Sequence, residues 1–262
     1  MNAIRTKSLK EILTDKARKL LSLYYTIGYP KIEDADLIFQ AISETNKVDF
    51  IELGMPYSDP LADGPTIQQT SSVAIRNGVT IHKYFEIAKH LRKQYRIPLI
   101  FMGYLNPVMQ FGMEKFCKGC VDAGIEGVII PDLPVEIYEQ DYQEIFAANN
   151  LLVSFLITPT TSEKRIRKIE ERTTGFIYVV SENSITGKNQ GTSIEQASYF
   201  ERLKNMQLQR LTIAGFGIHD YSSFNNACNY FNGAIIGSAF LRVLENENIK
   251  ESVSNFIQLV KP

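Results

Sequence analysis

Two carboxylates, Glu52 and Asp63, lie in one short stretch whose residue types could carry out acid–base chemistry. Glu52 interrupts the β-favouring run from Phe50 to Leu53, and Asp63 follows in a loop rich in glycine and proline. A lone carboxylate on a buried strand is unfavourable unless it is paired, protonated or used in function. Glu52 could be a structural residue bonded to neighbouring backbone, but the second carboxylate favours a two-carboxylate site.

A larger framework has to position these carboxylates, and the chain alternates regularly between strand and helix patterns. The expected strands cover residues 21–26, 50–53, 99–104, 127–130, 152–157, 177–180, 210–214 and 233–236. The expected helices cover residues 8–20, 33–43, 66–77, 81–95, 113–123, 137–149, 162–172, 194–204, 221–230, 239–244 and 249–260. Eight such units without a linker predict one α/β domain, residues 1–262, folded as a TIM (β/α)8 barrel with an extra N-terminal helix. A doubly wound parallel sheet is the weaker alternative.

A barrel places active residues at the carboxyl ends of its strands, which gives this prediction a test within the sequence. Polar or glycine positions do fall there, namely Glu52, Tyr104, Asp132, Thr158, Ser181, Gly215 and Gly237. Barrels also bind phosphate with glycine backbone N–H groups after the last two strands. Gly217, Gly237 and Ser238 stand in those places, and Gly187 of the long sixth loop could close over them.

Composition excludes several classes of function. The chain has 28 basic and 29 acidic residues, so it lacks the net positive charge typical of nucleic-acid binding. No apolar run is long enough to span a membrane, and the first fifteen residues lack the apolar core of a signal peptide. We therefore expect a cytoplasmic protein with no membrane or nucleic-acid partner.

Cysteine, histidine and lysine positions narrow the chemistry further. Cys117 and Cys120 form a lone C-x-x-C that we interpret as reduced thiols near a helix, and the three histidines have no metal-ligand spacing. None of the expected strands carries a lysine that could form a Schiff base, and no G-x-G-x-x-G follows the first strand. A small phosphorylated substrate acted on by two carboxylates is what remains.

The stretch Glu52 to Gln68, read as E-L-G-M-P-Y-S-D-P-L-A-D-G-P-T-I-Q, resembles the tryptophan synthase alpha subunit family. The resemblance continues through further segments as far as Arg242: 103–107, 131–134, 158–160, 181–187, 215–217 and 237–239. It implies a lyase of tryptophan biosynthesis that cleaves indole-3-glycerol phosphate into indole and glyceraldehyde 3-phosphate by a retro-aldol step.

The resemblance also implies roles for individual residues. Glu52 would be the general acid and base, and Asp63 would accept the indole N–H and stabilise the developing cation. Tyr178 and Thr186 would shape the site, and Gly187, Gly217, Gly237 and Ser238 would hold the phosphate. The apolar indole pocket would be lined by Tyr24, Met102, Ile129 and Phe216, although for the first three a plain core role is about equally expected.

Pro56 and Asp59 match family positions that face a β subunit, so the resemblance implies an α2β2 complex to whose β subunits indole passes. Pyridoxal phosphate would belong to that partner alone, and this chain would need no cofactor or metal.

In the sixth loop the chain departs from the family, because Ser184-Ile185 stands where members often have Gly-Val. That departure supports one alternative, a regulatory subunit that has lost its own turnover. Another phosphate-binding barrel isomerase or lyase is a third reading.

Overall fold

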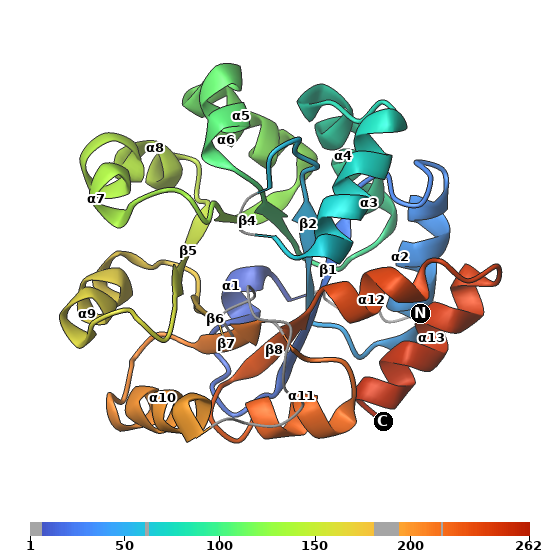
Figure 1. Cartoon of the computed structure of the whole chain (residues 1–262). Coiled ribbons are helices and arrows are strands. Elements are labelled where there is room, and N and C mark those ends of the chain that lie inside the picture. Colours follow the sequence, from blue (N-terminus) through green and yellow to red (C-terminus); the bar gives the residue numbers. More distant parts are fainter. Residues whose placement is uncertain (1–6, 61–62, 181–193, 216) are drawn as a thin grey trace.

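The structure is a computed structural model, and it describes residues 7–60, 63–180, 194–215 and 217–262. Eight parallel strands form a closed barrel in the order β1 to β8, with β8 pairing back to β1 (Figure 1). The strands are β1 Leu20–Thr26, β2 Phe50–Gly54, β3 Leu99–Met102, β4 Ile125–Ile129, β5 Leu152–Ile157, β6 Ile177–Val180, β7 Thr212–Gly215 and β8 Gly233–Ile236. The predicted TIM barrel is confirmed, and the doubly wound sheet is excluded because the sheet closes.

Helices surround the barrel, apart from α1, which covers one of its ends. They are α1 Leu9–Ile12, α2 Asp34–Thr45, α3 Pro65–Arg76, α4 Ile81–Gln94, α5 Leu105–Phe111, α6 Met113–Ala123, α7 Val135–Ile137, α8 Gln143–Ala148, α9 Glu163–Arg172, α10 Ile194–Asn205, α11 Tyr221–Ala227, α12 Ser238–Val243 and α13 Ile249–Val260. The expected helix 137–149 is in fact divided by a π-helical turn, η1 Tyr138–Tyr142. Pro65 occupies the first turn of α3, where its missing N–H needs no partner.

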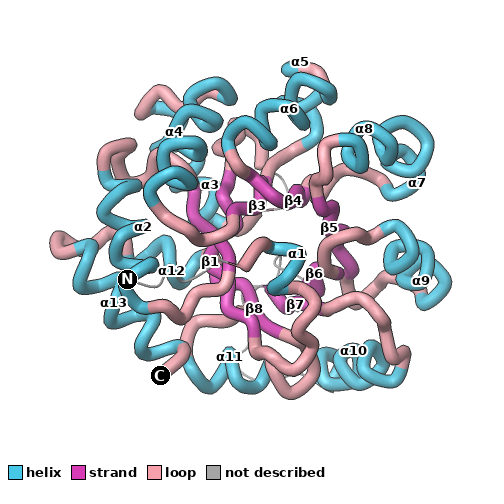
Figure 2. Tube along the Cα trace, turned by 180° about the vertical axis from the view of Figure 1, so that it is seen from behind, coloured by secondary structure: helices cyan, strands magenta, loops and turns pink. Residues whose placement is uncertain are grey.

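The extra N-terminal helix is a single turn rather than the helix 8–20 that the sequence pattern predicts. Ser8 and Glu11 form a reciprocal capping box at its start, and α1 ends at Ile12. Viewed from behind, α1 lies over the middle of the ring of strands (Figure 2). Leu9 is buried there, and its backbone N–H donates to the Glu126 carboxylate at 2.7 Å. The chain must turn back after this plug to enter β1, so the helix cannot continue.

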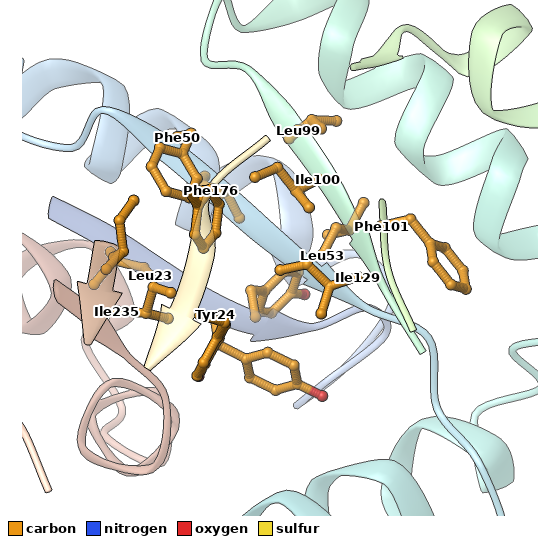
Figure 3. Packing of buried hydrophobic residues seen from close by; sticks show 14 of the residues in the cluster. Leu23, Tyr24, Phe50, Leu53, Leu99, Ile100, Phe101, Ile129, Phe176 and Ile235 are labelled. Atoms are coloured by element: carbon orange, nitrogen blue, oxygen red, sulfur yellow. The ribbon is translucent and has the colours of Figure 1, made fainter. Parts of the chain in front are cut away.

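Two aromatic rings, those of Phe50 and Phe176, lie close together among the buried side chains (Figure 3). Phe50 of β2 and Phe176, just before β6, are fully buried, and their ring centroids lie 5.6 Å apart. Because β2 and β6 are on opposite sides of an eight-stranded barrel, these rings meet across its interior. They form a floor that separates the carboxyl-end pocket from the rest of the core.

A buried carboxylate, Asp49, holds the opposite end of β1 and β2. It accepts the backbone N–H of Leu21 at 2.8 Å and pairs with Arg18 and with Lys261. A buried carboxylate is tolerated when it is paired and hydrogen-bonded in this way. The burial of the Asp49 carboxylate is therefore compensated by its ion pairs and hydrogen bond, whereas Glu52 has no such described partners.

Candidate active site

Glu52 is the third residue of β2, and it pairs in register with Tyr24 of β1 and Ile100 of β3. Its side chain is almost fully buried, and neither carboxylate oxygen has a hydrogen-bond partner among the described residues. Burial raises the pKa of Glu52 from 4.5 to about 8, so the folded protein keeps this carboxyl protonated at neutral pH. Unpartnered buried polar groups are rare and call for an explanation, and a proton donor facing an open pocket provides one.

The Phe50 and Phe176 rings explain why water does not reach Glu52 from the barrel interior. Strand side chains alternate, so Phe50 points to the same side as Glu52, and Phe176 to the same side as Tyr178. The ring of Phe176 stacks on Tyr178 with centroids 6.4 Å apart. The floor therefore lies directly under the layer that contains Glu52 and Tyr178, and it closes that layer to solvent from below.

Asp63 lies in the loop between β2 and α3, one residue before the N-cap of α3. Its backbone N–H donates to the Pro60 carbonyl at 3.0 Å, and its carbonyl accepts the Gln68 side chain at 2.9 Å. Burial raises the pKa of the Asp63 carboxyl from 3.8 to about 6, while a hydrogen bond from the Tyr104 hydroxyl acts in the opposite direction. Asp63 is therefore mainly ionised at pH 7, unlike Glu52.

Two buried tyrosines, Tyr24 and Tyr178, line the same pocket as these carboxylates. Burial raises the pKa of both Tyr24 and Tyr178, and the charges of Glu52 and Asp63 raise both further. Two strand-end glycines leave space for the phenols. A Cβ at Gly54 would lie 2.2 Å from the Tyr24 hydroxyl, and one at Gly215 would lie 2.1 Å from that of Tyr178. Glycine is thus required at both strand ends by the rings packed against them.

These groups open into a pocket of about 730 Å³, its mouth included, which is a size that suits a small ligand. It is lined by Tyr24, Glu52, Asp63, Ile67, Met102, Tyr178, Gly217, Ile218, His219, Ile235, Gly237, Ser238, Ala239 and Arg242. The two carboxylates come from β2 and the loop after it, whereas the glycines and the basic side chains come from the segments that follow β7 and β8. The pocket therefore has an acidic part and a glycine-rich part.

The glycine-rich part is built where the sequence predicts a phosphate site. Gly217 has φ +74°, a conformation that favours glycine, and its carbonyl accepts the Nδ1–H of His219 at 2.9 Å. Gly237 caps α12 and Ser238 begins it. A Cβ at Gly237 would make only ordinary contacts of 3.7 Å with Ile67 and Tyr24, so this glycine is not required by the packing of the protein itself.

The structure brings together most of the residues that the sequence predicts for the site. Those that line the pocket are Tyr24, Glu52, Asp63, Met102, Tyr178, Gly217, Gly237 and Ser238. Ile129 is fully buried in the core and does not line it. Thr186, Gly187 and Phe216 lie outside the described residues, as does Ser184. Near the mouth, Pro56 is buried, whereas Asp59 is exposed and accepts the Ser58 hydroxyl at 3.0 Å.

Several lining residues are not predicted by the sequence pattern: Ile67, Ile218, His219, Ile235, Ala239 and Arg242. Tyr104 is expected only as a strand-end residue, without its bond to Asp63. Arg242 could have been found, because it follows Ser238 by one helical turn and a helical side chain leans toward the helix start. Nothing in the sequence indicates that Ile67 of α3 reaches Gly237, the glycine that follows β8.

The cysteines and histidines do not form a second site in the described part of the chain. Cys117 and Cys120 are buried free thiols on α6, and burial raises the pKa of Cys117 to about 12. Among the described residues there is no group of three or more His, Cys, Asp or Glu side chains that could hold a metal ion. Within the same ranges, no helix has the length and apolar character needed to cross a membrane.

Comparison with known proteins gives one consistent result. The family model for the tryptophan synthase alpha chain matches residues 11–261. A tryptophan synthase alpha chain from Christiangramia forsetii is 51% identical over 243 residues, which is 93% of this chain and 94% of that relative. The structure of a mutant tryptophan synthase alpha subunit from Pyrococcus furiosus has a TM-score of 0.82 at 27% identity, covering 92% of this chain and 97% of that one. A chain of the tryptophan synthase complex from the same organism has a TM-score of 0.78 at 26% identity, with the same coverage.

Proposed function

This chain belongs to the tryptophan synthase alpha chain family, and from that premise we propose which of its residues perform the family's reaction. The alpha subunit is a lyase that cleaves indole-3-glycerol phosphate to indole and glyceraldehyde 3-phosphate in tryptophan biosynthesis. We propose that Glu52 is the general acid and base and that Asp63 is the electrostatic partner. The separation of their pKa values, about 8 against about 6, is the observation that supports this assignment.

The proposed reaction uses the protonation states that burial favours. Protonated Glu52 delivers its proton to carbon 3 of the indole ring, which leaves a positive charge shared with the ring nitrogen. Ionised Asp63 accepts the N–H hydrogen bond and stabilises that charge as it develops. Glu52, now a carboxylate, takes the proton of the adjacent glycerol hydroxyl as the carbon–carbon bond breaks. The products are neutral indole and an aldehyde, and Glu52 is protonated again.

The remaining lining residues have positioning roles in this proposal. Met102 and Tyr24 form the apolar surface around the indole ring, and Tyr178 of β6 shapes the pocket from the side of the barrel opposite Glu52. The backbone groups of Gly217, Gly237 and Ser238 hold the phosphate. Gly187 and Thr186 would complete the site, and Phe216 and Ile129 are retained as proposed substrate-binding residues; Ile129 pairs in register with the pocket-lining Met102. The chemistry needs only side chains of this chain, so we propose that it uses no cofactor of its own.

The partner is proposed to dock on the loop after β2. Asp59 is exposed there, and the same loop reaches α5, because the Asn106 amide donates to the Tyr57 hydroxyl at 3.3 Å. Tyr57 in turn stacks on Tyr104 with centroids 5.1 Å apart, and Tyr104 bonds Asp63. A β subunit bound at the exposed Asp59, in an α2β2 complex, would thus contact the segment that positions Asp63, and Pro56, which is buried, would contribute to this interface by shaping the loop. The pyridoxal phosphate of the complete enzyme would lie in that partner, and we propose that the complex acts in the cytoplasm as one barrel domain per alpha chain.

Turnover of indole-3-glycerol phosphate by the chain alone, with added β subunit, and with Asp59→Lys tests the proposal. We expect low activity alone, a marked rise with β subunit, and a weaker rise for Asp59→Lys at the same β concentration. If β subunit raised the activity of the Asp59→Lys variant as much as that of the native chain, the β subunit would bind at a surface that does not include Asp59. No turnover under any condition would favour a regulatory subunit, and turnover of a different phosphorylated substrate would favour another barrel enzyme.

A further inference from the structure

The pocket is lined by an arginine, Arg242, that forms no ion pair with any carboxylate in the described part of the chain. Of the described residues that line it, Arg242 alone carries a guanidinium and none is a lysine. Its Nη1 donates to the Thr66 hydroxyl at 3.3 Å, but no described carboxylate lies within ion-pair distance. A guanidinium has five N–H donors, so this long bond leaves most of them available to a ligand.

We propose that Arg242 binds the phosphate group of the substrate and makes the enzyme selective for a phosphorylated glycerol chain. The inference rests on the proposed function, because it places the phosphate at Gly217, Gly237 and Ser238. Arg242 follows Ser238 by four residues on α12, so the two side chains lie on one face, and that of Arg242 leans toward the start of the helix. The guanidinium is thereby directed toward the end of α12 where Gly237 and Ser238 lie.

The charges of the pocket explain why a cation is needed. An ionised Asp63 repels a phosphate dianion, and backbone N–H groups donate hydrogen bonds without adding a net charge. Helix α12 has only six residues, so its dipole is a weak substitute for a full charge. His219 also lines this part of the pocket, but its Nδ1–H is already used by the Gly217 carbonyl. Arg242 supplies a permanent positive charge and the paired N–H geometry that suits phosphate oxygens.

The test compares indole-3-glycerol phosphate with indole-3-glycerol, which lacks the phosphate, in the native chain, Arg242→Gln and Arg242→Lys. For Arg242→Gln we expect the KM of the phosphorylated substrate to rise about tenfold with kcat almost unchanged, as for an interaction made equally in ground and transition states. Arg242→Lys should lie between, because it keeps the charge but loses the paired geometry. Turnover of the unphosphorylated substrate should be the same in all three proteins.

Two control variants separate phosphate binding from a structural role. Arg76→Gln removes an exposed arginine at the end of α3 and should change neither KM. Thr66→Val removes the only described hydrogen-bond partner of Arg242 and should leave both KM values close to native. If Thr66→Val reproduced the effect of Arg242→Gln, or if Arg242→Gln weakened both substrates equally, Arg242 would be a structural residue and the inference would be wrong.

Gly237→Val distinguishes failure of this inference from failure of the proposed function. The valine side chain would occupy the proposed phosphate position, so the KM of the phosphorylated substrate should rise. If it rises for Gly237→Val but not for Arg242→Gln, the phosphate site stands and Arg242 has no part in it. If neither variant changes that KM, the proposed phosphate site itself is wrong, and the inference about Arg242 falls with it.

Discussion

Replacing Glu52 with glutamine should make the protein more stable at high pH while removing its activity. The folded protein holds the pKa of Glu52 at about 8, against the ordinary value of 4.5 in the unfolded chain. Between these values the unfolded chain has released a proton that the folded chain still binds. Folding stability that is present below pH 4.5 is therefore lost progressively as the pH rises to 8. Glutamine has nearly the same shape and no proton to lose.

The size of the effect follows from the two pKa values. One pKa unit corresponds to about 1.4 kcal/mol, so the ionisation of Glu52 in the unfolded chain lowers the free energy of unfolding by up to about 3 kcal/mol at pH 7 and up to about 5 kcal/mol at pH 9. Glu52→Gln is free of this loss. In a chain of this length, the difference in Tm between variant and native protein should grow from a few degrees at pH 5 to on the order of 10 °C at pH 9.

The assay is thermal unfolding at intervals from pH 5 to pH 9, with Glu247→Gln as the control. Glu247 is exposed near the C-terminus, so its replacement should shift Tm equally at every pH. Turnover of indole-3-glycerol phosphate by Glu52→Gln should fall at least ~10²–10⁴-fold, which is the range for a lost general acid and base. A Tm difference that does not grow with pH would show that Glu52 is not held protonated by burial. Near-native turnover would remove it from the mechanism.

Three further predictions concern its neighbours. Asp63→Asn should lower kcat by more than ~10²-fold while weakening substrate binding much less, since the charge matters most in the transition state; equal losses in both would contradict its role. Tyr104→Phe removes the hydrogen bond that lowers the pKa of Asp63, so the acidic limb of the pH–activity profile should move to higher pH. If that limb did not move, Tyr104 would have no influence on the ionisation of Asp63. Gly54→Ala places a methyl group 2.2 Å from the Tyr24 hydroxyl and should cost about 1–3 kcal/mol of stability, seen as a lower Tm, together with activity. An unchanged Tm would mean that the Tyr24 ring moves aside freely.

The sequence by itself determined the eight strand positions closely and the residues at their carboxyl ends. Period-two and helical patterns are local, and so are the glycines and prolines that end them. For this reason Glu52, Asp63, Gly217, Gly237 and Ser238 can be assigned to one end of a barrel from the order of residues alone. The helix expected over residues 8–20 is wrong in length, because its end is set by the barrel end that α1 covers, opposite the pocket, and not by its own amphipathic pattern.

Only the tertiary structure decided what lies opposite each of these residues. Alternation tells which face of a strand a side chain takes, but not that Phe50 meets Phe176 across the barrel and leaves Glu52 dry. The same limit applies to Ile129, for which the sequence leaves a pocket role and a core role equally open, and which the closed barrel buries fully. Contacts between strands far apart in the chain fix burial, and burial separates the pKa values of Glu52 and Asp63. The sequence therefore determines that two carboxylates are present at this end of the barrel. Which of them acts as acid and which stays ionised depends on burial, and that burial is set by the packing of the closed barrel.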